Sequence, residues 1–298
     1  MTWGKGVNND IGWGQGYTQS DWGSVYEDSW SGDTLLVSGE VTPPEPTLDT
    51  DAQAFITAAA ITDPTQQSAV NQLVLDLKTA NIWTKMKAVY PFVGGTATTH
   101  KWNLKDPRDL DAAFRLTFSG GWTHSSTGAL PNGTNGYADT YFNTDDTAST
   151  GLQSFGVYTR TSPTFAVNTI EVPTGLRGGI YWIRILSTAP TLTNFRSGSR
   201  SENINGVTGL IAQSRSSLTS WYGVNNSTIT TLTNLSSTIA TETTYTFALG
   251  AYKNLATIES FSTQQLAFAF YGEPLLTTEM SNFYTAIQTF QTTLGRNV

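Results

Sequence analysis

The chain of 298 residues has a net charge of −7 at pH 7 and a sequence pI of about 4.8, and it contains no cysteine. These values exclude a disulfide framework and a thiolate metal site, and an acidic chain without a Lys/Arg cluster argues against nucleic-acid binding. Only 13% of the residues are charged, about half the usual globular share. Thr, Ser, Asn and Gly take their place, which disfavours an all-helical protein and favours many short strands joined by turns.

Membrane and export signals are missing from the sequence. The longest apolar stretch, "AFITAAAI" at 54–61, is much shorter than the ~18 residues of a membrane helix. The first residues also lack the basic-then-apolar pattern of a secretion signal. We therefore expect a protein that does not insert into membranes.

The first forty residues hold four regularly spaced tryptophans, Trp3, Trp13, Trp22 and Trp30. This segment is too polar and too rich in glycine to bury a core of its own. A disordered leader is the simpler alternative, but disordered segments are poor in aromatic residues. Large aromatic side chains dominate buried interfaces. We therefore predict that residues 1–40 form an extended arm whose four tryptophans dock on a partner.

A Pro-rich linker at 41–50 separates this arm from a helical lead-in at 51–87. Asp63 is the expected N-cap of a helix, because Pro64 follows it at the first helical position. The helix presents one apolar stripe at spacing i, i+3, i+4, i+7, formed by Val70, Leu73, Val74 and Leu77. We expect this stripe to pack on a sheet or on the preceding helix.

Residues 88–298 change to short β-type runs broken by Gly, Asn and Pro, and we predict an antiparallel two-sheet sandwich. The expected strands are 114–118, 136–142, 154–160, 178–186, 209–215, 244–252 and 265–272. The last of these alternates large and small apolar residues, which is typical of a strand covered on both faces.

A C-terminal helix is expected next, with Thr277 as its N-cap, Glu279 in its first turn and Gly295 at its C-terminus. Its apolar stripe comprises Met280, Phe283, Tyr284, Ile287, Phe290 and Leu294.

Three stretches carry a family resemblance: "AFRLTFSGGWTHSSTGALPNGTNGYADTYFNT" (113–144), "SFGVYTR" (154–160) and "AFYGEPLLTTEMSNFYTAIQTFQTTLGR" (269–296). They resemble concanavalin A-like (LamG-like) jelly-roll modules in virion proteins of tailed bacteriophages, especially phages of Bacteroidetes bacteria. The resemblance covers roughly residues 85–298 and the helical lead-in, and the Trp-Gly arm also looks like the start of such proteins. It implies a mainly β, concanavalin A-like sandwich on a phage particle.

Catalytic patterns are weak. A Ser-His-Asp triad would have to use His100 or His124, the two histidines of the chain, and no G-x-S-x-G motif is present. We interpret His124 as a surface or turn histidine. Glu171 and Glu259 are isolated, and the E-x-D-x-x-E run of jelly-roll glucanases is absent. We therefore expect no enzymatic activity.

Calcium is the one cofactor that the resemblance leaves open, because LamG-like modules sometimes bind it. Asp106, Asp109 and Asp111 lie close together in "KDPRDLD" and are weak candidate ligands, since calcium needs six to eight oxygen ligands. The alternative for these aspartates is a solvated turn followed by a helix start.

Sugar sites combine an aromatic platform with fixed polar groups. Trp122, Tyr137, Trp221 and Tyr222 lie near Gly/Asn-rich loops and are the candidate platform residues. The alternative for each is ordinary core or loop packing.

We interpret the chain as a structural virion component, assembled in the host bacterial cytoplasm as a homo-oligomer and anchored to other virion proteins by its arm. A head fibre or capsid decoration is the first choice of location, and a tail fibre or baseplate protein is the second. The alternative function is a carbohydrate-binding module that attaches to host surface glycans.

Overall fold

The computed structural model describes residues 48–149, 151–164, 170–176, 181–186, 189–197, 200–217, 219–232, 246–254 and 257–298. All of them belong to one compact unit, Thr47–Val298. The predicted arm, with Trp3, Trp13, Trp22 and Trp30, and residues 41–47 of the linker lie outside the described residues.

The helical lead-in begins with α1 (Thr50–Ala58) and α2 (Pro64–Thr79). Asp63 caps α2 as predicted, because its Oδ1 accepts a hydrogen bond from Gln66 N at 2.9 Å. The apolar stripe is also confirmed, since all of its members are buried: Val70, Leu73, Val74 and Leu77.

The lead-in ends earlier than predicted. A 3₁₀ turn, η2 (Trp83–Lys85), follows α2, and β1 (Met86–Tyr90) begins directly after it. β1 pairs antiparallel with a strand of the sandwich at Met86↔Gly272 and three further positions. Residues 86 and 87 are therefore part of a sheet, because the apolar side chains of "MKAVY" are buried there instead of continuing a helical stripe.

Sheet A lies beneath the helices. Its strand order is β13 (Thr228–Thr231), β12 (Trp221–Asn225), β11 (Gly209–Arg215), β6 (Gln153–Thr159), β17 (Leu266–Gly272), β4 (Gly128–Pro131) and β3 (Trp122–Ser125), and β1 also pairs with β17. All of these pairs are antiparallel.

Sheet B forms the opposite layer. Its order is β10 (Arg200–Asn205), β9 (Ala189–Ser197), β8 (Tyr181–Leu186), β7 (Ile170–Leu176), β14 (Ala248–Leu249), β5 (Tyr137–Asp139) and β2 (Thr117–Ser119). Two short strands extend it, β15 (Tyr252–Asn254) and β16 (Thr257–Glu259). Only β15 with β7 is a parallel pair in the described part of the sheet.

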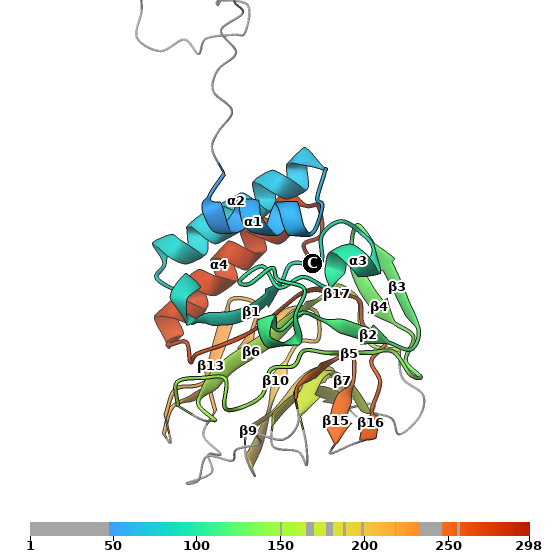
Figure 1. Cartoon of the computed structure of the whole chain (residues 1–298). Helices are drawn as coiled ribbons and strands as arrows, with labels where there is room; N and C mark the ends of the chain where they lie inside the picture. Colours follow the sequence, from blue (N-terminus) through green and yellow to red (C-terminus); the bar gives the residue numbers. More distant parts are fainter. Residues whose placement is uncertain are drawn as a thin grey trace, which may run out of the picture. The chain divides into compact units, whose positions relative to one another are not determined.

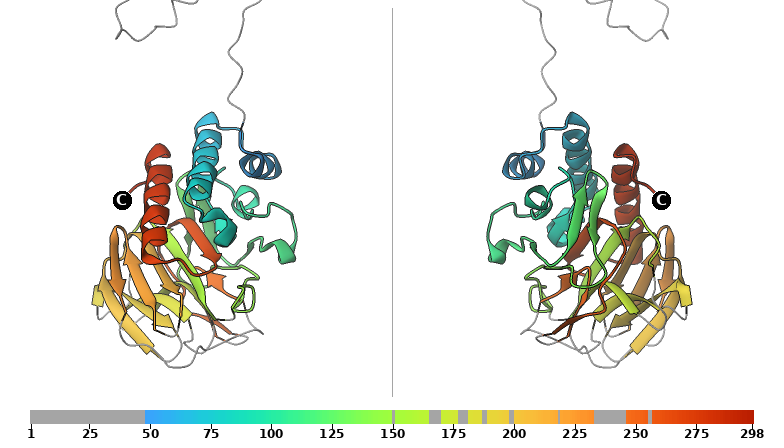
Figure 2. Two further views of the ribbon diagram at one scale, coloured as in Figure 1. Left: turned by 90° about the vertical axis from the view of Figure 1, so that its left-hand side faces the viewer. Right: turned by 90° about the vertical axis from the view of Figure 1, so that its right-hand side faces the viewer.

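The molecule thus has three layers: the helices α1, α2 and α4 (Thr277–Thr293), sheet A, and sheet B (Figure 1). The views from the two sides show the helices covering one face of sheet A (Figure 2). One buried apolar cluster lies between the helices and sheet A, and a second lies between the two sheets. The predicted fold class, a mainly antiparallel jelly-roll sandwich with a C-terminal helix, is confirmed.

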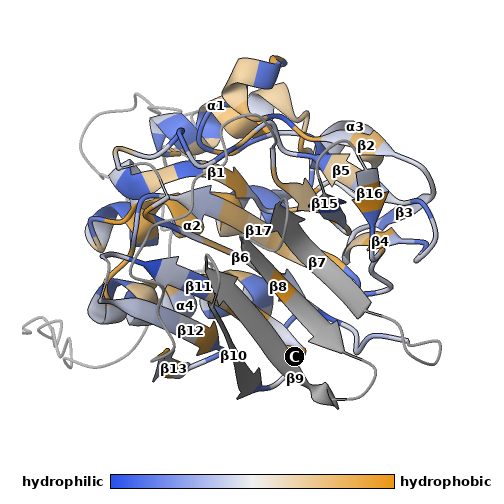
Figure 3. Ribbon diagram, turned by 90° about the horizontal axis from the view of Figure 1, so that it is seen from below, coloured by the Kyte–Doolittle hydropathy of each residue, from blue (hydrophilic) through white to orange (hydrophobic). Residues whose placement is uncertain are grey.

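β17 lies at the centre of this arrangement, and all seven of its residues are buried. Phe268 and Phe270 belong to the cluster beneath the helices, whereas Ala269 and Tyr271 belong to the cluster between the sheets. Figure 3 shows β17 coloured as apolar along most of its length. The prediction of a strand covered on both faces is confirmed.

The C-terminal helix α4 differs from the prediction at its start. Leu276 is the N-cap and Thr277 the first helical residue, and the carboxylate of Glu279 accepts a hydrogen bond from Leu276 N at 2.8 Å. Gly295 follows the helix with φ +64°, a left-handed conformation that favours glycine. Of the predicted stripe, Met280, Phe283, Ile287 and Phe290 are buried, and Tyr284 and Leu294 are partly buried. Among the described residues, no helix is both long and apolar enough to span a bilayer.

The other predicted strands have mixed outcomes. The strands expected at 154–160 and 209–215 match β6 and β11. The run 114–118 forms a strand only from Thr117, because Phe114 adopts a left-handed φ of 57° at the end of the 3₁₀ turn η3 (Asp111–Ala113). The run 244–252 lies partly outside the described residues, and its described part contributes to two short strands, β14 and β15.

Candidate functional site

The strand expected at 136–142 is shorter in the structure, where β5 (Tyr137–Asp139) is followed by the irregular segment 140–142. Ala138 and Phe142 are buried in the cluster between the sheets, and Thr140 is also buried. Tyr137 and Asp139 flank Ala138 on β5 and therefore lie on the opposite, outward face. Tyr141 follows the end of the strand, and its hydroxyl lies 2.9 Å from Oγ1 of Thr117, the residue paired with Asp139, so its side chain reaches the same face. We call Tyr137, Asp139 and Tyr141 the outward row. In the sequence, its one carboxylate lies between two tyrosines.

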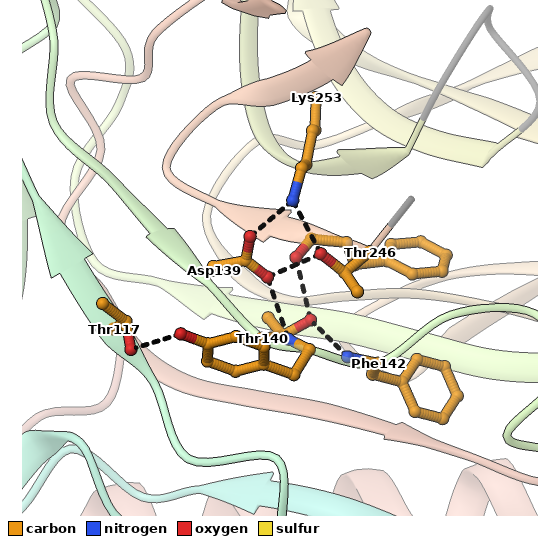
Figure 4. Close-up of polar contacts among 8 residues, drawn as sticks. Thr117, Asp139, Thr140, Phe142, Thr246 and Lys253 are labelled. Carbon is orange, nitrogen blue, oxygen red and sulfur yellow. Dashed lines mark hydrogen bonds and ion pairs between the residues drawn. The ribbon is translucent and has the colours of Figure 1, made fainter. Parts of the chain in front are cut away.

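Asp139 is fixed by hydrogen bonds from three directions. Lys253 Nζ forms an ion pair with Asp139 Oδ2, and Thr246 Oγ1 donates to Asp139 Oδ1 at 2.6 Å. Lys253 also donates to Thr246 Oγ1 at 2.7 Å, so the three side chains form a closed triangle (Figure 4). The side chains of Asp139 and Lys253 are 20% and 17% exposed. The charges are thus held in place but remain reachable from solvent.

The tyrosines of the row are held as well. Tyr141 has φ +58°, uncommon for a non-glycine residue, and its N donates to Asp139 Oδ1 at 3.0 Å. Its hydroxyl lies 2.9 Å from Thr117 Oγ1 on the neighbouring strand β2. The carbonyl of Tyr137 accepts a hydrogen bond from Trp122 Nε1 at 3.1 Å. The Asp139 and Tyr141 side chains and the backbone of Tyr137 are therefore held in place without a ligand, which lowers the entropic cost of binding.

The four predicted platform residues do not form one site. Trp221 is fully buried and donates from Nε1 to Gln213 Oε1 at 3.0 Å, so the prediction that its ring meets a sugar is wrong. Trp122 is half-buried and packs against Phe118 and the cluster between the sheets. Tyr222 lies on β12 opposite Ser214, whose hydroxyl bonds to Leu275 O on the helix-covered side of sheet A. Of the four, Tyr137 alone belongs to the outward row.

The predicted calcium ligands are engaged by basic side chains instead. Asp106 pairs with Arg108, whose hydrogen bond lowers the pKa of the Asp106 carboxyl. Asp109 accepts from Lys101 at 2.6 Å, and this bond lowers its pKa. Asp111 pairs with Arg115 at 2.8 Å. No group of three or more His, Asp or Glu in the described ranges could hold a metal ion. The three aspartates instead form ion pairs with Arg108, Lys101 and Arg115.

The two histidines lie together, and His124 lies on a strand, contrary to its interpretation as a surface or turn histidine. His124 lies on β3, and its Nδ1 is 2.9 Å from Nδ1 of His100, the last residue of α3 (Ala97–His100). His100 is buried, and burial, with lesser effects of His124 and Arg296, lowers its pKa from 6.5 to about 3. Burial also lowers the pKa of His124. No hydroxyl nucleophile is bonded to either ring in the part of the chain that the structure describes.

No family model and no curated protein matches the sequence. Among solved structures, a Trypanosoma rangeli sialidase mutant that displays trans-sialidase activity is similar at a TM-score of 0.49 and 9% identity, over 75% of this chain and 39% of the sialidase chain. Botulinum neurotoxin type C, whose cell entry is described as dependent on interaction with two ganglioside molecules, is similar at a TM-score of 0.48 and 10% identity, over 70% of this chain and 53% of the toxin chain.

A third similar structure is domain 4 of AbnA, an extracellular GH43 arabinanase from Geobacillus stearothermophilus in complex with arabinotriose. Its TM-score is 0.40 at 15% identity, over 67% of this chain and 98% of that domain. This chain thus spans well under half of the first sialidase that it matches. At such low identity a functional argument has to come from the residues of this chain.

Sequence reasoning missed Asp139, Tyr141, Thr246 and Lys253. The alternation of "YAD" is a local signal that could have placed Asp139 beside Tyr137 on one face. The left-handed φ of Tyr141 interrupts this alternation, so its place had no such signal. Lys253 is 114 residues away from Asp139, and no local pattern links two residues at that separation.

Proposed function

We propose that the sandwich is a non-catalytic carbohydrate-binding module and that the outward row is its binding site. The observation that supports this proposal best is Asp139, fixed by Lys253 and Thr246 between two outward tyrosines. Sugars present apolar C–H faces and a ring of hydroxyl groups. A site for them needs aromatic faces beside a few fixed hydrogen-bonding groups.

The polar groups of the site suit neutral hydroxyl ligands. The Asp139 carboxylate accepts three hydrogen bonds from Thr246, Tyr141 N and Lys253, and a carboxylate offers about four acceptor positions. Lys253 uses two of its three N–H groups on Asp139 and Thr246. One acceptor and one donor therefore remain side by side in the described structure, the pattern that a pair of adjacent sugar hydroxyls needs.

The test is a glycan array probed with the full chain and two variants. Tyr137→Ala removes an aromatic face from the outward row. Tyr222→Ala is the matched control, because Tyr222 is also half-buried but lies on the other sheet. The proposal expects glycans that bind wild type and Tyr222→Ala but not Tyr137→Ala. Binding by all three proteins alike, or by none, would contradict it.

A glycoside hydrolase is the competing class. A retaining glycosidase needs two carboxyl groups about 5 Å apart, whereas the outward row contributes one, Asp139. Incubation of the full chain with the polysaccharides that it binds should release no reducing ends. Their release, abolished by Asp139→Asn, would replace the binding module by an enzyme.

We also propose that the chain is a component of a tailed-phage particle, anchored by residues 1–40. The Trp-Gly segment and the sequence resemblance to phage virion proteins support this location. The two buried clusters are built from residues after the linker, so deletion of residues 1–40 should leave a folded protein that no longer joins particles. Normal incorporation of the truncated protein, measured by mass spectrometry of purified particles, would contradict the anchoring role.

A further inference from the structure

The His100–His124 pair joins two segments that are otherwise separate in the chain. One is the 94–100 segment that ends in α3, and the other is the β3–β4 hairpin. They touch at their backbones, since a Cβ added to Gly95 would stand 3.1 Å from Ser126 N in the hairpin turn. The hairpin lies at the edge of sheet A, where β4 pairs with β17 at Ala129↔Leu266. The contact with the 94–100 segment supports the hairpin beside the hydrogen bond from Gln265 Nε2 to Thr127 Oγ1 at 3.0 Å.

The hydrogen bonds of the pair define the tautomer of each ring. Gly95 N donates to His100 Nε2 at 3.2 Å, so Nε2 carries a lone pair. In a neutral imidazole the other nitrogen then bears the proton, and His100 Nδ1 donates to His124 Nδ1 at 2.9 Å. His124 in turn carries its proton on Nε2. Both hydrogen bonds are satisfied only when both rings are neutral.

A proton added to either ring removes one of these bonds. A protonated His124 carries a proton on Nδ1. This N–H then faces the Nδ1–H of His100, and the two donors repel each other unless His100 moves its proton to Nε2. The tautomer change turns His100 Nε2 into a donor that faces the N–H of Gly95. A protonated His100 meets Gly95 in the same way, because both of its nitrogens are then donors.

Among the described residues, no acidic group acts on the pKa of His100 or of His124 to compensate such a proton. The titratable and charged groups that face His100 are His124 on β3 and Arg296 beyond α4, and both oppose a second positive charge. Arg296 is itself buried, with its guanidinium donating to the carbonyls of Phe92 and Pro91. The remaining ring neighbours are aromatic: Phe92 against His100, and Phe118 and Trp122 against His124.

Trp122 connects this pair to the outward row. Its ring lies 6.1 Å from that of His124 at an interplanar angle of 25°. Its Nε1 donates to the carbonyls of Tyr137 and Ser119, each at 3.1 Å. A displacement of β3 would therefore remove a hydrogen bond from the backbone of Tyr137.

We propose that the His100–His124 pair makes the β3–β4 hairpin, and through Trp122 the outward row, sensitive to acid. The neutral pair holds the hairpin against the 94–100 segment, and protonation of His124 releases it. Ligand affinity at the row then falls with the pH. This last consequence rests on the proposed function, whereas the release of the hairpin does not.

Two measurements on the full chain test the hairpin. Long-range ¹H–¹⁵N NMR at pH 7.5 should show His100 protonated on Nδ1 and His124 on Nε2, and the opposite tautomers would overturn the inference. Hydrogen exchange of peptides covering 122–131, corrected for intrinsic rates, should show lower protection at pH 4.5 than at pH 7.5, because burial lowers the pKa of His124 in the closed hairpin and acid therefore favours the released one. Equal protection at pH 7.5 and pH 4.5 would also overturn it.

His124→Asn is the matched variant. The Oδ1 atom of Asn can take the place of Nδ1 and accept from His100 without titrating in this range. We expect the hairpin of this variant to stay protected at both pH values. A loss of protection in acid equal to that of wild type would show that other groups cause the release, and the inference would be wrong.

The ligand arm separates this inference from the proposed function. With a glycan identified on the array, wild type should bind at least about tenfold more weakly at pH 4.5 than at pH 7.5, while His124→Asn changes less. An equal loss in both proteins would contradict the coupling to the row. Absence of any glycan ligand at pH 7.5 would contradict the proposed function. In that case the hydrogen-exchange measurement would still test whether acid releases the hairpin.

Discussion

β17 and residues 137–142 are two stretches with several aromatic residues, yet they occupy different environments. In β17 both faces are covered, one by helices and one by sheet B, and all seven residues are buried. In 137–142 one face is covered and the other carries Tyr137, Asp139 and Tyr141 at half-burial. A strand that is covered on both faces contributes only to the stability of the core. A strand with one exposed face can also carry polar side chains for binding, at little cost to the stability of the core.

The largest effect is expected at the helix-covered face of β17. Phe270 is fully buried, with its ring centroid 4.4 Å from that of Phe283 in α4. Phe270→Ala removes this contact and leaves a cavity, so the free energy of unfolding should fall by about 3–5 kcal/mol. Urea denaturation measures it. A loss below about 1 kcal/mol would show that the packing of α4 on β17 contributes little to the stability of the fold.

Acid should weaken the fold through His100. Its pKa is lowered from 6.5 in the unfolded chain to about 3 in the fold, so the fold prefers the neutral ring. This stabilisation is complete above pH 6.5 and is lost as the pH falls toward 3, by about 2–3 kcal/mol at pH 4.5.

Urea denaturation at pH 7.5 and at pH 4.5 measures this loss in the free energy of unfolding, with the His100→Gln variant as the comparison. The Gln Oε1 atom can still accept from Gly95 N but does not titrate, so the variant should lose less stability in acid than wild type. Parallel pH profiles of the two proteins would contradict the assignment to His100.

A smaller effect on stability is expected at the start of α2, one of the helices that cover sheet A. Asp63→Ala removes the acceptor of the Gln66 N–H bond and should cost about 1 kcal/mol, as N-cap removals do. Asp63→Asn keeps an acceptor oxygen and should cost less. Thermal or urea unfolding distinguishes the two variants, and equal losses would contradict the capping role.

The smallest effect on stability is expected in the outward row itself. Tyr137 is half-buried and its backbone, not its ring, bonds to Trp122. Tyr137→Ala should therefore change the free energy of unfolding by less than about 1 kcal/mol. A loss as large as that of Phe270→Ala would erase the distinction between the two stretches.

Sequence patterns predicted the elements whose signals are local. α2 has its Asp-Pro start and one apolar stripe, and β6, β11 and β17 are continuous runs of strand-forming residues. Elements set by distant contacts were missed. The first two residues of β1, Met86 and Lys87, are assigned to the helical lead-in by the sequence, but pairing with β17 makes them part of a strand.

The candidate site shows the same limit. Trp122 and Trp221 have similar Gly/Asn-rich surroundings in the sequence, but the register of β12 turns Trp221 into the core between the sheets. His100 and His124 meet only because the 94–100 segment folds against the β3–β4 hairpin. Contacts between side chains that are far apart in the sequence depend on the order of the strands in the sheets. Patterns in a single sequence do not encode that order.

The most direct test of the central claim is calorimetric titration of one array-identified oligosaccharide into wild type, Tyr137→Ala and Tyr222→Ala at pH 7.5. If the open face of sheet B is the binding site, Tyr137→Ala should weaken binding at least about tenfold, more than 1 kcal/mol, with unfolding unchanged within 1 kcal/mol, and Tyr222→Ala should bind as wild type does. Full affinity in Tyr137→Ala, or a loss confined to Tyr222→Ala, would contradict the assignment.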